Sequence, residues 1–209
     1  MLERKPPKPK KCKVCSEQFT PSRMGQKLCG QSCAISFGRE LNKKNAEKLA
    51  KAERIADKAK RESLKKISEL EQECREIVQK IARIRDRNDG CISCHMPPNY
   101  HGAWHGSHYR AHGGCSSLQF HLWNIHKSCA QCNLFKGGNR EGYVRGLLKK
   151  PGYGRERIEW LDTQPKSKKF SREYLVRFKA VMGKRCRRLE KRARAEDELR
   201  VETLEQAPC

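Results

Sequence analysis

The sequence predicts a mainly α-helical chain that carries two small cysteine-rich zinc modules. Eight of the 12 cysteines form four close pairs, and a chain without a secretory signal is expected to use such pairs for metal rather than for disulfides. Residues 39 to 87 contain neither Pro nor Gly and are dense in Ala, Glu, Lys and Arg, which favour helix. Residues 88 to 150 hold all seven histidines and many glycines, which indicates loops and short strands.

The charge of the chain predicts a polyanionic partner. Lys and Arg number 47 against 24 Asp and Glu, a formal net charge of +23 over 209 residues. DNA or RNA is the expected partner, with an anionic membrane surface second. No segment approaches the ~20 apolar residues of a membrane span, and MLERKPPKPKK has no apolar signal core, so we expect a cytoplasmic protein with no membrane partner.

Five regions follow one another along the predicted chain. They are a disordered basic tail (1–11), a four-cysteine zinc finger (12–38), a long charged helix or coiled coil (39–87), a zinc-braced module (88–150) and a basic helical C-terminal region (151–209). We expect the zinc-braced module to close with a short helix near Tyr143 to Leu148. A further helix is expected from 155 to 162, and Ser171 is expected to cap a last helix that ends near Leu204.

Two apolar stripes are predicted on the helices. The long helix carries a seam at alternating three- and four-residue steps: Ile67, Leu70, Cys74, Ile77, Ile81 and Ile84. The last helix carries a second stripe: Tyr174, Leu175, Phe178, Val181 or Met182, and Leu189. The seam has two alternative partners. A second copy of the chain would make a homodimer, and the last helix of the same chain would make an intramolecular core.

Each zinc module is predicted from paired cysteine knuckles. Cys12, Cys15, Cys29 and Cys33 form the first set; Cys91, Cys94, Cys129 and Cys132 form the second, with 34 residues between its knuckles. Four thiolates suit tetrahedral Zn²⁺, and a segment so poor in apolar residues needs the ~10–16 kcal/mol of apparent free energy that structural zinc supplies. One of the many histidines is an alternative ligand in the second set.

The remaining cysteines and the basic residues near the first knuckle have simpler expected roles. Four cysteines are expected to be buried small apolar groups or idle thiols: Cys74, Cys115, Cys186 and Cys209. The first zinc finger is either purely structural or presents a set of cations to phosphates: Lys10, Lys11, Lys13, Arg23 and Lys27.

The loop between the second pair of knuckles carries more than a zinc ribbon needs. It contains WHGSHYR and WNIH, and a further asparagine directly follows the last cysteine. This set resembles the HNH nucleases of the ββα-metal class, in an HNN variant. The resemblance implies that His108 is the general base, that Asn124 orients the base by bonding the backbone beside it, and that Asn133 binds a catalytic metal ion.

The residue types suit hydrolysis of a phosphodiester. A neutral histidine can act as a base near pH 7, contributing about 10²–10⁴-fold, and one divalent ion stabilises the charge that develops on the phosphate. Residues 88 to 150 contain only two acidic residues, Asp89 and Glu141, which excludes the clustered carboxylates of a two-metal nuclease. The expected cofactor is therefore one Mg²⁺ or Mn²⁺ ion.

The ligand set of this ion departs from the usual motif. HNH enzymes place Asp or His directly before the base, where this chain has Ser107. His105 and His126 are the alternative ligands beside Asn133. The competing roles are that His108 binds phosphate or metal without moving a proton, that Asn124 is an ordinary turn residue, and that Asn133 caps a helix.

A wider resemblance covers about residues 10 to 190. The order is a four-cysteine site, a charged helix ending in RDRND, then CISC, HYR, NIHKSCAQCN, KGGN and a basic C-terminal helix. This order resembles the lambdoid-phage recombination endonucleases of the NinG or Rap family. It implies a structure-specific DNA endonuclease in the cytoplasm of a phage-infected host, acting on branched double-stranded DNA such as Holliday junctions and D-loops.

Six cations are the expected DNA contacts: Arg110, Lys127, Lys136, Arg140, Lys10 and Lys11. Solvated surface charges would give the same pattern. A rival function is a non-catalytic zinc-dependent DNA-binding protein that assists recombination. A third is an RNA-binding or RNA-cleaving protein, although the sequence has no stacking-platform motif.

Overall fold

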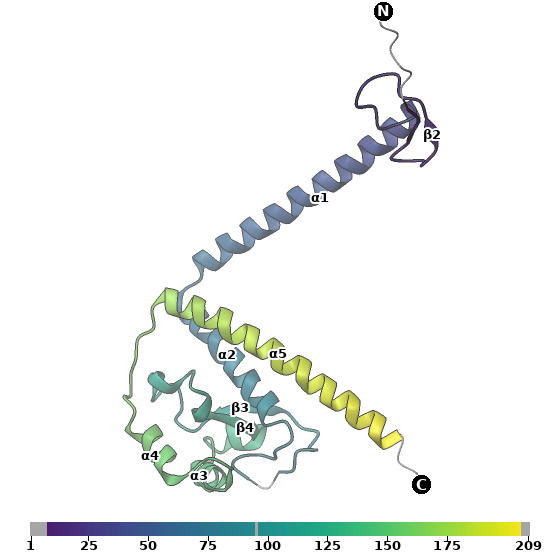
Figure 1. Cartoon of the computed structure of the whole chain (residues 1–209). Coiled ribbons are helices and arrows are strands. Elements are labelled where there is room, and N and C mark those ends of the chain that lie inside the picture. The colour runs from purple at the N-terminus through teal and green to yellow at the C-terminus, as the bar shows by residue number, and fades with distance from the viewer. Residues whose placement is uncertain (1–7, 95, 206–209) are drawn as a thin grey trace, which may run out of the picture. The chain divides into compact units, whose positions relative to one another are not determined.

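A computed structural model describes residues 8–94 and 96–205, with side chains placed up to residue 200 (Figure 1). The chain divides into two compact units, Met1–Leu64 and Lys65–Cys209, and each is described by itself. The structure is mainly helical, as predicted, with two small two-stranded sheets and a long C-terminal helix. Within the described residues, no helix is both long enough and apolar enough to cross a membrane.

The first unit is a small hairpin followed by a long helix. Strand β1 (Lys10–Lys11) pairs antiparallel with β2 (Gln18–Phe19), and helix α1 runs from Gln31 to Leu64. Lys10 and Lys11 were predicted to end a disordered tail, and this boundary is corrected by their pairing; residues 1–7 of the tail lie outside the described residues. Helix α1 has no buried side chain.

The predicted single helix from 39 to 87 is wrong in both its start and its continuity. It begins earlier, at Gln31, and it is interrupted at residues 65–66 before α2 (Ile67–Arg85). The cause is local: Lys66 has an extended backbone (φ −70°, ψ 156°), and its N–H donates to a carboxylate oxygen of Glu69 at 2.9 Å. This bond satisfies one amide at the start of α2, as in a capping box, and so begins a new helix.

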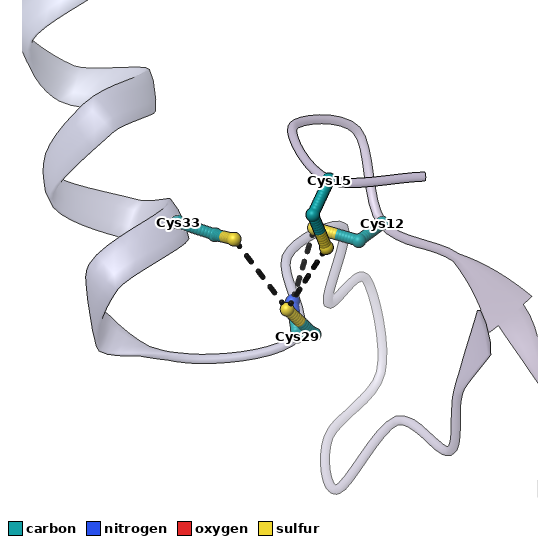
Figure 2. A group of neighbouring side chains, drawn as sticks. All are labelled: Cys12, Cys15, Cys29 and Cys33. Carbon is teal, nitrogen blue, oxygen red and sulfur yellow. Dashed lines mark hydrogen bonds between the residues drawn. The ribbon is translucent and has the colours of Figure 1, made fainter. Parts of the chain in front are cut away.

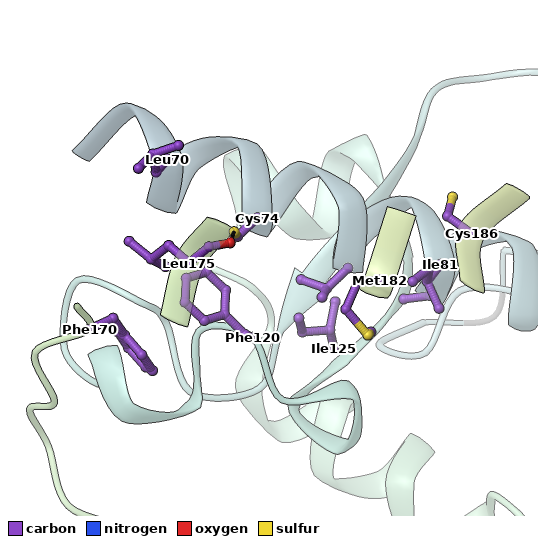
Figure 3. Close-up of a cluster of buried hydrophobic side chains, with 11 residues drawn as sticks. Leu70, Cys74, Ile81, Phe120, Ile125, Phe170, Leu175, Met182 and Cys186 are labelled. Carbon is purple, nitrogen blue, oxygen red and sulfur yellow. Dashed lines mark hydrogen bonds between the residues drawn. The ribbon is translucent and has the colours of Figure 1, made fainter. Parts of the chain in front are cut away.

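The core of the second unit lies between α2 and α5 (Arg172–Glu205). The Ser171 hydroxyl accepts a hydrogen bond from the Tyr174 N–H at 3.2 Å, so this residue caps α5 as predicted. Figure 3 shows the buried side chains that meet here, drawn from α2, α5 and the segment between them: Leu70, Cys74, Ile81, Phe120, Ile125, Phe170, Leu175, Met182 and Cys186. The seam of α2 therefore packs within the same chain from Leu70 to Ile84, whereas its first residue, Ile67, is exposed.

The stripe predicted for α5 is only partly buried. Leu175 and Met182 lie in the core, whereas Tyr174 and Val181 are about half exposed. The core takes up Cys186 instead, one helical turn after Met182. Cys74 and Cys115 are buried as well, which confirms the expectation of buried apolar thiols for these three cysteines; Cys209 lies outside the described residues.

A β-hairpin occupies the middle of the second unit. Strand β3 (Trp104–His108) pairs antiparallel with β4 (Ile125–Cys129), with His108 opposite Ile125 and Trp104 opposite Cys129. The connection contains the short 3₁₀ turns η1 (Ser116–Leu118) and η2 (Leu122–Asn124). A short π-helix, η3 (Gln131–Phe135), follows, and then the helices α3 (Arg140–Lys149) and α4 (Arg155–Thr163). The predicted short helices near 143–148 and 155–162 are thus confirmed.

The hairpin lies directly against α2. A Cβ atom on Gly106 would lie 2.6 Å from both Cα and Cβ of Gln79 on α2, and 2.8 Å from its carbonyl oxygen. The backbone of α2 cannot give way as a flexible side chain would. Only glycine at this position allows β3 to approach the helix so closely.

The variant Gly106→Ala is expected to destabilise the second unit by about 1–3 kcal/mol, because an overpacked contact must be relieved by moving backbone. Gly113→Ala is the matched control, since a Cβ atom there would meet nothing within 4 Å. Chemical denaturation followed by circular dichroism measures both. Equal free energies of unfolding for the two variants would contradict the close packing of β3 on α2.

Candidate metal centres and the histidine hairpin

The first cysteine cluster lies at the start of α1. The Sγ atoms of Cys12, Cys15, Cys29 and Cys33 lie within 4.8 Å of one another. Figure 2 shows these four side chains gathered before and at the start of the helix. Hydrogen bonds from the backbone amides of Cys15 and Val14 lower the pKa of Cys12 to about 6, which favours its thiolate. Thiolates held by backbone N–H groups are the donors that Zn²⁺ prefers, so the cluster fits a structural zinc site.

The second cluster joins the segment after α2 to the end of the hairpin. The Sγ atoms of Cys91, Cys94, Cys129 and Cys132 also lie within 4.8 Å of one another, and no histidine belongs to the group among the residues described. Burial raises the pKa of Cys91, but hydrogen bonds from the Ser128 hydroxyl and from backbone amides outweigh burial and lower it to about 7. This four-thiol set is likewise consistent with structural zinc.

Helix α3 packs against the first knuckle of this cluster. A Cβ atom on Gly142 would lie 2.0 Å from the carbonyl oxygen of Ser93, and one on Gly146 would lie 1.9 Å from that of Ile92. The side-chain amide of Asn139, directly before α3, donates to the Ser93 carbonyl at 2.8 Å and to the Cys132 thiol at 3.6 Å. Asn139 therefore ties the two knuckles to α3.

An ion pair anchors the other end of β4 to α2. Arg85 binds the buried carboxylate of Asp86 through two contacts of 2.7 Å, and also donates to the carbonyl of Ile125 at 2.7 Å. Asp86 in turn accepts from the backbone N–H of Lys127 at 3.2 Å and from Lys150 at 3.1 Å. Burial alone would raise the pKa of Asp86, but the hydrogen bonds and charge of Arg85 lower it, so the group stays ionised.

The two faces of the hairpin carry different histidines. Side chains alternate along a strand, and directly opposite residues share a face. His108 therefore lies with Gly106 on the face toward α2, whereas His105 shares the opposite face with Ser107 and His126. The geometry of the strands thus separates the predicted base from two of its predicted metal ligands.

His108 lies at the end of β3 in a mostly buried position. Its Nε2 atom is 3.0 Å from the carbonyl oxygen of Gln119. A carbonyl can only accept, so Nε2 carries the proton and Nδ1 is left with a lone pair. Burial lowers the pKa of His108, and the nearby His112 and Arg75 lower it further. The imidazole is therefore neutral at pH 7, in the tautomer whose Nδ1 can accept a proton.

Gln119 connects His108 to α2. Its side-chain oxygen accepts from Arg75 at 2.8 Å, and its amide nitrogen donates to Glu71 at 3.4 Å. The His108 ring also lies 5.9 Å from the ring of His112. Sequence reasoning missed Gln119 and His112, because nothing in the spacing of the chain relates residue 119 to α2.

Asn124 closes the long loop between the strands. It is fully buried; its Oδ1 accepts from the N–H of Arg110 at 2.8 Å, and its Nδ2 donates to the carbonyls of Arg110 at 3.0 Å and Leu118 at 3.2 Å. The bonds to Arg110 fix the backbone two residues after His108. This is the placement that the HNH resemblance implied for the middle asparagine.

Two of the three predicted ligands of a catalytic ion, His105 and His126, do not share the hairpin face of His108. The third, Asn133, directly follows Cys132 of the second knuckle. It lies inside η3 and not at a helix cap, and neither side chain is a hydrogen-bond partner of the other. The shared site of His108 and Asn133 therefore stays a prediction.

His126 is held in a second buried position, against α3. The Tyr143 hydroxyl donates to the Ser107 carbonyl at 2.8 Å, so Nδ1 of His126 must donate to that hydroxyl at 3.2 Å. Its Nε2 is buried without a partner, and burial followed by the charge of Arg85 lowers the pKa of His126 to about 3. Among the described residues, His126 belongs to no group of three or more His, Cys, Asp or Glu side chains that could hold a metal ion.

Some of the cations predicted to contact DNA bind other residues of the chain, and the others are exposed. Lys127 is buried, donates to the Arg87 carbonyl at 2.9 Å and lies 4.2 Å over the Trp104 ring. At the end of α4, Arg110 donates to the backbone carbonyl of Leu161 at 2.7 Å and to that of Gln164 at 3.0 Å. The predicted phosphate contact of Lys127 is corrected, because its side chain is buried and bonded within the chain. Arg110 stays partly exposed, and its phosphate contact stays a prediction.

The other predicted cations stay accessible to a ligand. Lys10, Lys11 and Lys136 are exposed. Arg140 is more than half exposed, although it pairs with Asp162 at 3.2 Å and lies over the Tyr109 ring at 4.6 Å.

The variant Asn124→Ala is expected to destabilise the second unit, because it leaves the buried hydrogen-bond partners of Asn124 unpaired, each at a cost of about 1–3 kcal/mol. Thermal unfolding measures the effect. Asn99→Ala is the control, since Asn99 is exposed and should change stability by less than about 0.5 kcal/mol. Similar melting temperatures for both variants would show that the Asn124 bonds do not hold the loop.

Comparison with known proteins gives a consistent family. A family model described as "Bacteriophage Lambda NinG protein" matches residues 4–193. Protein ninG of Escherichia phage 933W is 31% identical over 157 residues, covering 70% of this chain and 77% of the relative. Protein ninG of Escherichia phage lambda is 28% identical over 187 residues, covering 83% and 90%.

A third relative, protein ninG of Salmonella phage P22, is 30% identical over 156 residues, covering 68% of this chain and 76% of its own. No solved structure gives a significant match. The family match spans both cysteine clusters, the histidine hairpin and most of α5. The chain therefore belongs to the bacteriophage lambda NinG protein family.

Proposed function

We propose that the chain is a structure-specific DNA endonuclease that cuts branched recombination intermediates, such as Holliday junctions and D-loops, with His108 as the general base. The observation that carries the proposal is the state of His108. Its Nε2–H is bound to the Gln119 carbonyl and its lowered pKa keeps it neutral, so Nδ1 is free to take a proton from water.

Two further observations support this assignment. Asn124 holds the Arg110 backbone beside the base through two hydrogen bonds, which limits how far the loop can carry His108 from its orientation. The net charge of +23 suits a substrate with closely spaced phosphates.

Outside the two cysteine clusters, the described residues form no group of three or more His, Cys, Asp or Glu side chains that could hold the expected single Mg²⁺ or Mn²⁺ ion. His105 and His126 lie on the hairpin face opposite His108, and Asn133 belongs to neither strand. The proposed hydrolysis is therefore supported by His108 as the base and not by a metal site. A homodimer also stays part of the proposal, because resolving a junction requires two cuts, although the α2 seam packs within one chain.

A second candidate function has its own supporting observation. The only groups of three or more metal-binding His, Cys, Asp or Glu side chains among the described residues are the two cysteine clusters. A chain with structural zinc and no catalytic ion would be a DNA-binding accessory protein of recombination.

The variant His108→Ala is expected to lower the cleavage rate of a synthetic four-way junction by about 10²–10⁴-fold, because the proton acceptor is lost. Cleavage is measured on gels across a Mg²⁺ and Mn²⁺ series, and binding is measured by fluorescence anisotropy. His101→Ala is the control, since His101 is exposed.

A pH profile adds an independent signature. The active form of the base is unprotonated, so the cleavage rate should rise with pH, with a midpoint below the ordinary histidine pKa of about 6.5, because the pKa of His108 is lowered. No cleavage by the wild type with either metal would favour the accessory function. Unchanged cleavage by His108→Ala would remove His108 as the base.

A further inference from the structure

An open cavity of about 620 Å³ lies beside the loop that Asn124 closes. Its walls come from η2, from the segment before α4 and from α5, and they include Trp123, Tyr153, Arg157, Met182 and Arg185. This volume falls within the ~300–1,000 Å³ typical of sites that enclose a small molecule or one group of a larger ligand. None of these side chains has a role in the site around His108.

Trp123 and His121 in the wall of the cavity pack against Trp160, which does not itself line the cavity. The rings of Trp123 and Trp160 meet edge to face at 5.5 Å, and the ring of His121 lies 5.3 Å from Trp123 and 5.0 Å from Trp160. Trp123 is 40% exposed and Trp160 is 38% exposed. Two neighbouring tryptophans of the three in the chain thus keep a large apolar surface in water, where a flat ligand could cover it.

The cations around these rings differ in what they already bind. Arg85 and Lys150, in the inner wall, share the buried carboxylate of Asp86. Arg157 lies over the rings of Trp123 at 4.0 Å and Tyr153 at 4.6 Å. Within the described part of the chain, no carboxylate pairs with Arg157 or Arg185, so either can turn toward an anion without breaking an ion pair.

We propose that this cavity binds an unstacked nucleobase at the branch point of DNA, with the base on the Trp123 ring and the adjoining phosphates on Arg157 and Arg185. Every base has a π-face, so such a site is tolerant of sequence but needs a nucleotide that has left its duplex. This inference rests on the proposed DNA substrate and adds how a branch is told from a linear duplex.

The position of Trp123 connects the cavity to the candidate site. Trp123 directly precedes Asn124, and its carbonyl accepts a hydrogen bond from the Tyr153 hydroxyl at 3.1 Å. Asn124 in turn fixes the backbone beside His108. A base held on Trp123 would therefore anchor the DNA strand close to the loop that carries the proposed base.

The test compares a synthetic four-way junction with a linear duplex of the same arm sequence, by fluorescence anisotropy at fixed salt without added divalent metal. Trp123→Ala is expected to weaken junction binding roughly tenfold and to change duplex binding less than twofold. Trp123→Phe, which keeps an aromatic face, should bind the junction within about threefold of the wild type.

A matched pair of arginine variants compares a cation in the cavity with a cation outside it. Arg157→Ala should weaken junction binding more than Arg192→Ala, which removes one exposed cation from α5 outside the cavity. Circular dichroism and bound-zinc content establish that each variant is folded.

The outcomes distinguish this inference from the proposed function. A wild type without preference for the junction overturns both. If the wild type prefers the junction and the folded Trp123→Ala variant keeps that preference, only the proposal for the cavity is overturned. This holds whatever the His108 variant does in the cleavage assay. Loss of preference in Trp123→Ala and its recovery in Trp123→Phe support the cavity.

Discussion

The clamp formed by Cys91, Cys94, Cys129 and Cys132 is the interaction on which the second unit depends. It joins the segment after α2 to the segment after β4, and so fixes one end of the hairpin. Arg85 and Asp86 fix the other end through β4 and the Ile125 carbonyl. Neither anchor is a large apolar core, which suits a chain with only 36% apolar residues.

The alternation of side chains along the two strands decides what the hairpin can do. His108 faces α2, where Gln119 fixes its tautomer, whereas His126 faces α3, where Tyr143 fixes the opposite tautomer. One imidazole keeps a lone pair on Nδ1 and the other on Nε2. Two histidines that look equivalent in sequence are thus different chemical groups: His126 lies near the positive charges of Arg85 and Lys150, and His108 lies near that of Arg75.

The sequence predicted local features well and relations between distant segments poorly. Knuckle spacing identified both cysteine clusters, and composition identified most helices, because these signals reside in neighbouring residues. The break at Lys66 was missed, since a Lys has no cap preference and the determining bond comes from Glu69. The separation of His108 from His105 and His126 was also missed, because a motif gives the order of residues but not the strand face each one occupies.

We infer that the second cysteine cluster, which is consistent with a structural zinc site, holds the hairpin that presents His108. Hydrogen exchange of the β3 amides tests it most directly in Cys91→Ser, with Cys12→Ser as the control because Cys12 belongs to the other unit. The account predicts that β3 loses at least about tenfold of its protection in Cys91→Ser and none in Cys12→Ser. Unchanged protection of β3 in Cys91→Ser, in a protein that has lost one zinc ion, would contradict it.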